Sequence, residues 1–179
     1  MAEISTERLI MRSWRESDLA PWAAMNADSE VRRYVGPLLT FGQAEAWVLN
    51  FQDDLDRHGF GFWALETSAS GEFIGFTGLG IVDEEMPVTG VEIGWRLARS
   101  AWGHGYTTEA ARAALEYGFG VLTLPEIVAV TTATNLRSQA VMERIGMTRD
   151  PAEDFDDPDV EEPSLRRHVL YRRRRDPEH

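Results

Sequence analysis

The stretch VEIGWRLARSAWGHGYTTEAA, residues 91 to 111, decides the fold of this chain. Apolar residues alternate from Val91 to Leu97 and predict a β-strand. Gly103 and Gly105 then predict a tight turn that leads into a helix. Glycines leave no Cβ between such a turn and a ligand, and the N–H groups at a helix N-terminus attract anions. The stretch therefore predicts a strand, a phosphate-binding turn and a helix.

Two common phosphate-binding turns do not fit. The Lys and the four-residue spacer of the Walker A motif are missing, and so is the third glycine of the dinucleotide fingerprint. Residues 99 to 110, RSAWGHGYTTEA, instead resemble the WGxGYATEA form of the pyrophosphate loop in GCN5-related N-acetyltransferases (GNAT), in the branch of the ribosomal-protein-alanine acetyltransferases. Three further segments match that branch in order: TERLIMR at 6 to 12, NLRSQAVMERIGM at 135 to 147, and RHVLY at 167 to 171. The resemblance covers nearly the whole chain.

Length and composition bound the class of protein. With 179 residues the chain is expected to form one domain, 1 to 179, with a sizeable core. It has no Cys, which excludes disulfides and a thiol nucleophile. No basic and apolar leader and no long apolar run is present, so we expect a cytoplasmic protein that does not enter a membrane.

Charge argues against nucleic acid as a partner. The net charge is −12, and the run from Asp150 to Glu162 carries eight acidic residues and no basic one. Only the arginines 172 to 175 would meet a polyanion favourably, and such a cluster is more typical of a solvated chain end.

The predicted elements alternate between strand and helix. A strand at Leu9 to Met11 precedes a helix capped by Ser17 or Asp18, and the capping-box spacing of Thr40 and Gln43 opens a helix that ends near Gly59. The remaining expectations are strands at 61 to 66, 73 to 80, 91 to 97, 127 to 132 and around 169, and helices at 107 to 119 and 136 to 145. This order predicts a mixed α/β fold with helices on both faces of one sheet. The resemblance implies the GNAT fold, in which two parallel strands splay apart.

The resemblance implies that acetyl-CoA is bound at the glycine turn. Main-chain N–H groups of Trp102, Gly103, His104, Gly105, Tyr106 and Thr107 would meet the pyrophosphate, and Arg99, Arg112 or Arg137 would approach the 3′-phosphate. The pantetheine arm would pair with the strand end at Leu97, Ala98 and Arg99 like an added strand. For the side chains of His104 and Tyr106 we expect structural rather than chemical roles.

Asn135 and Ser138 are the next candidates. Asn135 is placed to cap a helix, and the resemblance adds a hydrogen bond to pantetheine, so the cap alone and the cap with a ligand contact both stay open. Many GNAT enzymes have a Tyr seven positions after this Asn as the acid, but this chain has Met142. The branch it resembles uses a Ser at the position of Ser138, which would stabilise the leaving thiolate by a hydrogen bond while water or the ammonium supplies the proton. The alternative is an ordinary serine in a first helical turn.

Glu92 is the candidate general base, a role that the family often places at this position. Alternation puts its side chain on the opposite face from Ile93 and Leu97. The pKa of an ordinary Glu carboxylate is about six units below that of a lysine-like ammonium and about 3.5 units below that of an α-ammonium. Proton transfer to Glu92 is therefore easier from an α-amine, or if the pKa of Glu92 is raised. The alternative is an acid that only orients main chain or Arg96.

The site for the amine acceptor is harder to predict. In the family the early helices frame it, so Trp14, Tyr34, Phe62 and Trp63 are candidates, although such aromatics are more often core residues. The acidic run could steer a cationic acceptor, or it could be a solvated loop.

The sequence thus predicts an N-acetyltransferase that moves an acetyl group from acetyl-CoA to a primary amine of a peptide or small molecule. A main-chain N–H near Leu97 would hold the oxyanion, Glu92 would accept a proton through water, and no metal is expected. Because the tyrosine is missing, a non-catalytic acyl-CoA sensor is the alternative. An interaction protein that uses the acidic run and the arginine tail is a second one, and a homodimer is possible.

Overall fold

A sheet of nine strands forms the centre of the computed structural model, which describes residues 3–158 and 160–175. The strand order is β1-β2-β3-β4-β5-β6-β9-β7, and β8 pairs with β9. Among these strands only β5 and β6 run parallel to each other. The strands are β1 (Ile4–Ser5), β2 (Leu9–Arg12), β3 (Phe62–Thr67), β4 (Phe73–Ile81), β5 (Val91–Leu97), β6 (Glu126–Thr132), β7 (Thr148–Arg149), β8 (Phe155–Asp156) and β9 (Arg167–Arg174).

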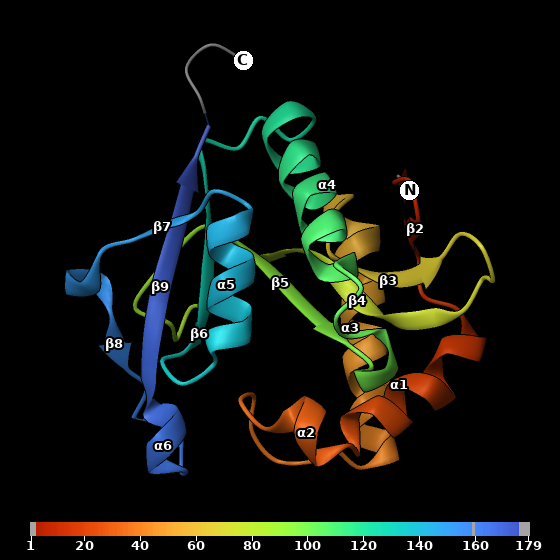
Figure 1. Ribbon diagram of the computed structural model, residues 1–179, viewed down its shortest axis with the longest axis horizontal. Coiled ribbons are helices and arrows are strands. Elements are labelled where there is room, and N and C mark those ends of the chain that lie inside the picture. Colours follow the sequence, from red (N-terminus) through yellow and green to blue (C-terminus); the bar gives the residue numbers. More distant parts are fainter. Residues whose placement is uncertain (1–2, 159, 176–179) are drawn as a thin grey trace.

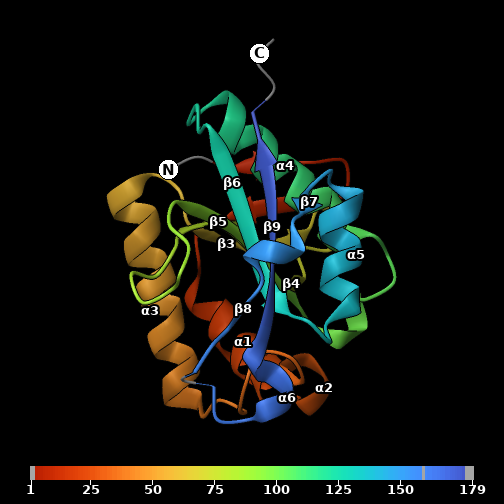
Figure 2. The same cartoon turned by 90° about the vertical axis from the view of Figure 1, so that its left-hand side faces the viewer.

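Helices cover both faces of this sheet. Figure 2 shows the strands between α3 on one side and α4 and α5 on the other. The helices are α1 (Leu19–Asn26), α2 (Ser29–Arg32), α3 (Phe41–His58), α4 (Tyr106–Gly120), α5 (Leu136–Arg144) and α6 (Pro163–Arg166). The predicted mixed α/β architecture is therefore confirmed.

The local signals in the sequence account for the ends of the long helix α3. The Thr40 hydroxyl accepts from the Gln43 amide and the Gln43 side chain accepts from the Thr40 amide, which is the predicted capping box. The helix ends where Gly59 adopts a left-handed φ of 75°. Its buried face, which includes Phe51 and Leu55, packs with Trp22 of α1 against the sheet. On the other face α4 buries mainly alanines, whose small side chains let it lie close to β4 and β5.

The elements that sequence patterns did not predict are all short. They are the two-residue strands β1, β7 and β8 and the four-residue helices α2 and α6, besides three 3₁₀ turns. Segments of this length carry no measurable periodicity, so tertiary contacts decide their conformation. No described helix is both long and apolar enough to cross a lipid bilayer.

Candidate active site

The glycine turn and the start of α4 form one wall of the site. Gly103 has a φ of 81° and Gly105 a φ of 79°, both left-handed. A Cβ on Gly103 would meet nothing within 4 Å, and on Gly105 only Nη2 of Arg8 at 3.7 Å, so the backbone conformation rather than crowding requires glycine. The first helical bond of α4 joins the Glu109 amide to the Gly105 carbonyl at 3.1 Å. The amides of Tyr106, Thr107 and Thr108 precede it, so they have no partner within the helix and can bind an anion.

The beginning of the chain holds this turn in place. Glu109 accepts hydrogen bonds from the Thr6 hydroxyl at 2.6 Å, the Arg8 amide at 2.9 Å and Nε of Arg8 at 2.7 Å. Arg8 also donates to the carbonyl of His104 at 3.0 Å and lies over the ring of Tyr106. Burial opposes the ionisation of Glu109, but the hydrogen bonds from Thr6 and Arg8 prevail and lower its pKa. Thr6 and Arg8 were noticed in the sequence only as part of a resemblance, and the structure gives them this supporting role.

The end of β5 forms the floor of the site. β5 and β6 share the single bridge pair Glu92 and Val128, and Figure 1 shows the two strands diverging beyond it. The Ala98 amide donates to Ile74 of β4 at 2.8 Å, so the alternation of an antiparallel pair turns the main-chain groups of Ala98 and Arg96 towards β4. Those of Trp95 and Leu97 face the gap instead. The Leu97 carbonyl accepts from the Trp102 indole at 2.9 Å, and its N–H is left facing the gap between the strands.

Asn135 and Ser138 lie at the start of α5 on the other side of the gap. The Asn135 carbonyl oxygen accepts from the Ser138 amide at 3.3 Å, so Asn135 caps the helix. Its amide nitrogen donates to the hydroxyls of Thr131 at 3.0 Å and of Ser138 at 3.1 Å, which uses both of its hydrogens. The Ser138 hydroxyl oxygen is thereby an acceptor, and its own hydrogen stays available for another group.

Met142 occupies the position where many enzymes of the family that the sequence resembles have a tyrosine that acts as the acid. Its side chain is buried in the main hydrophobic core, with an exposed fraction of 2 %. A methionine in this place contributes packing and no ionisable group.

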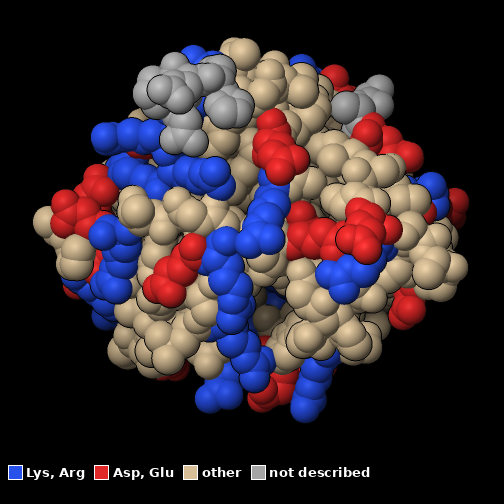
Figure 3. Space-filling view, turned by 45° about the horizontal axis from the view of Figure 1, so that its top comes forward, with Lys and Arg blue, Asp and Glu red and all other residues tan. Residues whose placement is uncertain are grey.

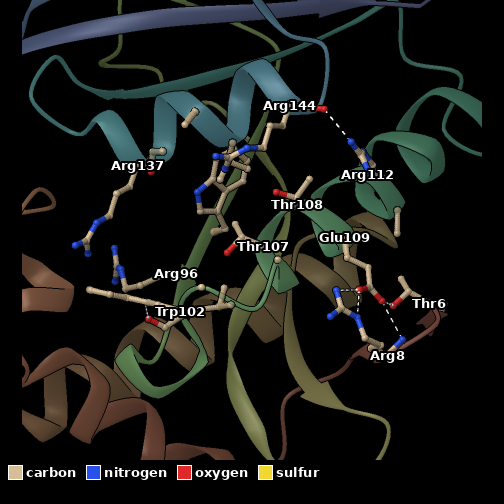
Figure 4. A pocket seen from close by; sticks show the side chains of 18 of the residues that line it. Thr6, Arg8, Arg96, Trp102, Thr107, Thr108, Glu109, Arg112, Arg137 and Arg144 are labelled. Carbon is tan, nitrogen blue, oxygen red and sulfur yellow. Dashed lines mark hydrogen bonds and ion pairs between the residues drawn. The ribbon is translucent and has the colours of Figure 1, made fainter.

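These parts surround one groove of about 1690 Å³. Seven of the predicted residues line the groove: Leu97, Trp102, Gly103, Gly105, Thr107, Asn135 and Ser138. Four others belong to the same segments but do not reach the groove surface: Ala98, Arg99, His104 and Tyr106. Figure 4 shows the arginines around it, and Figure 3 shows basic side chains in a band beside a hollow in the surface. The free amides and these cations suit the pyrophosphate and 3′-phosphate of CoA.

Arginines from α4 and α5 supply most of the positive charge. Arg112 and Arg137 line the groove and Arg99 does not, which reduces the predicted candidates for the 3′-phosphate to two. Arg137 lies over the Trp102 ring, and Arg112 donates to the carbonyl of Arg144 at 3.1 Å. Arg144 also lines the groove, and sequence reasoning missed it. Its spacing of seven from Arg137 on one helix was the signal that could have found it.

Glu92 lies apart from the groove lining. It is five residues before Leu97, about 17 Å along an extended strand, and its side chain is on the face of β5 opposite that of Leu97, which it shares with Arg96. Burial, and next to it the negative charge of Asp83, raise the pKa of Glu92 to about 7. Arg96 does not pair with it, because that guanidinium donates to Asn26 at 2.9 Å. A role in proton transfer therefore requires intervening water.

The predicted acceptor residues divide into lining and core. Tyr34 lines the groove, whereas Trp14 and Trp63 are buried core residues and Phe62 packs against that core. The acidic run makes ion pairs with neighbouring strands: Asp154 with Arg149, Asp156 with Arg167 at 3.3 Å and Glu153 with Arg172 at 2.9 Å. It contributes no described residue to the groove. Among the described residues no three acidic or His side chains are grouped to hold a metal ion.

A family model described as an acetyltransferase (GNAT) domain matches residues 8–148. The uncharacterized protein YkkB of Bacillus subtilis is 34% identical over 81% of this chain and 84% of its own length. The FsC-acetyl coenzyme A-N(2)-transacetylase of Aspergillus fumigatus is 32% identical over 69% of this chain and 55% of its own length.

Solved structures share the fold. An acetyltransferase from Agrobacterium tumefaciens superimposes with a TM-score of 0.81 at 27% identity, over 98% of this chain and 95% of that one. RimL, the ribosomal L7/L12 α-N-protein acetyltransferase solved with CoA, gives 0.79 at 15% identity over 98% and 99%. The fold and the family match thus define the class of this protein as an acyltransferase. The chain belongs to the GNAT acetyltransferase family.

Proposed function

We propose that the chain transfers the acetyl group of acetyl-CoA to a primary amine by direct attack of the amine on the thioester. The observation that carries this proposal is the convergence of three free donors on one groove: the amides at the start of α4, the Leu97 N–H at the strand gap, and the Ser138 hydroxyl. The A. fumigatus relative, named for transfer from acetyl coenzyme A to an N(2) position, supports the donor and the type of acceptor.

Each donor has a distinct role in this proposal. The α4 amides and the groove arginines bind the phosphates, while the main chain at Leu97 aligns the pantetheine arm. The Leu97 N–H stabilises the oxyanion that develops when the amine attacks. Ser138, oriented by Asn135, donates to the sulfur as the thiolate leaves, and because an alcohol is a far weaker acid than a thiol it keeps its proton.

Glu92 takes the proton of the attacking amine through water in this scheme. A pKa of about 7 leaves much of Glu92 ionised at neutral pH and brings it closer to that of an α-ammonium, which reduces the uphill transfer from about 5 to about 1 kcal/mol. This match favours an α-amine as the acceptor.

Thiol release from acetyl-CoA, measured with a panel of primary amines, tests the proposal. We expect at least one amine to raise the rate well above hydrolysis and to appear as its N-acetyl derivative by mass spectrometry. CoA binding without turnover across the panel would instead identify a non-catalytic acyl-CoA sensor. That alternative arises because the buried Met142 replaces the tyrosine that acts as the acid in many related enzymes.

A further inference from the structure

Two arginines without acidic partners meet near the end of β5, the buried Arg32 and the half-buried Arg96. Arg32, on α2, has an exposed fraction of 4 %, and Arg96, on β5, lines the groove. Both guanidinium groups face the ring of Trp47, at 5.9 and 5.2 Å from its centre. None of the described carboxylates forms an ion pair with either.

The polar contacts of the two side chains are incomplete. Arg96 donates from Nη1 to the Asn26 side chain, while its Nε is buried and has no acceptor. Arg32 donates to the carbonyls of Pro37 and Val35, and its Nη1 is likewise buried without a partner. Native structures rarely leave charged donors unpaired, because each loses its hydration without compensation.

The electrostatics point the same way. Burial, and then the charge of Arg32, lower the pKa of Arg96 to about 9, and burial lowers the pKa of Arg32. No acidic group is among the causes in either case. Guanidinium groups keep their proton at neutral pH, so both side chains carry a positive charge, and each raises the cost of burying the other.

The position of Arg96 limits what could supply the missing negative charge. It immediately precedes Leu97, and Figure 4 shows its guanidinium at the same end of the groove as Trp102 and Arg137. An anion bound to the Arg96 guanidinium would lie within the length of that side chain from the main chain at Leu97, next to which the amine is proposed to attack the thioester. Val31, Tyr34 and Val35 line the adjoining wall and would contact the remainder of a small molecule.

We propose that Arg96, supported by the charge of Arg32, binds a carboxylate of the acceptor, so that the acceptor is a small amino acid whose amine and carboxylate are a few bonds apart. Guanidinium and carboxylate form charge-assisted, often bidentate, hydrogen bonds. The inference rests on the proposed acetyl transfer and narrows its acceptor. Polyamines, which the net charge of −12 alone would attract, are disfavoured by two cations at this position.

The test compares amino acids with their carboxamides, which lack the negative charge and also have a more acidic ammonium group, so the rates are compared at equal concentrations of free amine. In the acetyl-transfer assay we expect the wild type to prefer an amino acid to its carboxamide by about tenfold or more in kcat/KM. Arg96→Gln should raise KM for the amino acid by about as much, with Arg96→Lys in between, while KM for the carboxamide stays unchanged. Arg57→Gln, on the exposed face of α3, is the matched control and should behave as wild type. Equal kcat/KM for the two compounds in the wild type would overturn the inference.

A binding measurement separates this inference from the proposed function. Calorimetry on the CoA-saturated wild type should detect the N-acetyl amino acid and not the N-acetyl carboxamide, and Arg96→Gln should lose the difference. Selective binding without any acetyl transfer would refute the proposed function and keep the carboxylate site. Transfer to amines without such selectivity would keep the function and refute the site. Thermal unfolding of Arg96→Gln establishes that the variant is folded, and Arg32→Gln gives an independent variant with the same expected direction.

Discussion

Ser138 and Asn135 show how one helix start can serve both folding and chemistry. Asn135 stabilises α5 as its cap, and the same amide group hydrogen bonds to the Ser138 hydroxyl oxygen. The hydroxyl hydrogen is thereby oriented without a second side chain. The sequence placed both residues in one helical turn. It could not decide between a cap and a ligand contact, because that depends on which groups accept the two hydrogens of the Asn135 side-chain amide.

Ser138→Ala is expected to lower kcat by about 10- to 100-fold and to leave the KM for acetyl-CoA nearly unchanged. The lost hydrogen bond acts on the charge that forms on sulfur in the transition state. Steady-state kinetics with a fixed acceptor measure this split. Ser100→Ala, an exposed serine that does not line the groove, is the control, and equal kcat values for the two variants would contradict the role of Ser138.

Glu92 should give the activity a pH dependence near neutrality. With a raised pKa of about 7 the base is half ionised at that pH and mostly protonated below it, so kcat/KM should rise with pH and level off above about 7. In Glu92→Gln this rise of kcat/KM with pH, the acidic limb of the profile, should be lost. Glu116→Gln, an exposed carboxylate in the groove, should retain it. A limb that survives in Glu92→Gln would assign the titration to another group, such as the acceptor amine.

The same group should affect stability in a direction that can be checked. Below pH 4.5 Glu92 is protonated in both states, whereas above pH 7 the folded state must hold a buried charge that the unfolded chain hydrates. Replacing Glu92 by Gln should therefore raise the free energy of unfolding at pH 8 by up to about 3 kcal/mol and leave it unchanged at pH 4. Urea titrations at both pH values measure this, and an equal effect at the two would show that the pKa is not shifted by folding.

Among the elements, the turn between β5 and α4 is where sequence and structure agree most closely. Gly103 and Gly105 predicted a tight turn, and the structure has one in which both glycines are left-handed, with α4 beginning one residue earlier than expected, at Tyr106. The local signal sufficed because glycine is the residue that adopts this conformation without strain. The hydrogen bonds from Thr6 and Arg8 to Glu109 could not be predicted in the same way, because they join residues about a hundred positions apart.

Gly105→Ala should therefore weaken CoA binding by about tenfold and lower the free energy of unfolding by about 1 to 2 kcal/mol, from backbone strain alone. A Cβ at position 105 would have room, so no clash contributes. Gly42→Ala, in the first turn of α3 with no neighbour within 4 Å, is the matched control and should be neutral or slightly stabilising. Calorimetry with CoA and urea unfolding provide the two readouts. Unchanged affinity in Gly105→Ala would mean that the turn does not bind the phosphates.

On the scale of the whole molecule, positive charge gathers at the groove although the net charge of the chain is negative. The chain carries a net charge of −12, but arginines from α4 and α5 gather at the groove, and the acidic run is engaged with arginines of β7 and β9. Composition predicted the acidic run and could not locate its partners, since these ion pairs form between strands distant in sequence. Order of motifs, in contrast, predicted the architecture well, because each long element carries its own periodicity and caps.

The central claim is that CoA binds across the gap between β5 and β6. A crystal structure of the protein with CoA tests it most directly. The account predicts the pyrophosphate on the amides of Tyr106 to Thr108, the pantetheine arm along the main chain at Leu97, and the thiol within hydrogen-bond reach of the Ser138 hydroxyl. CoA bound outside this groove, or a thiol that points away from both Leu97 and Ser138, would contradict it.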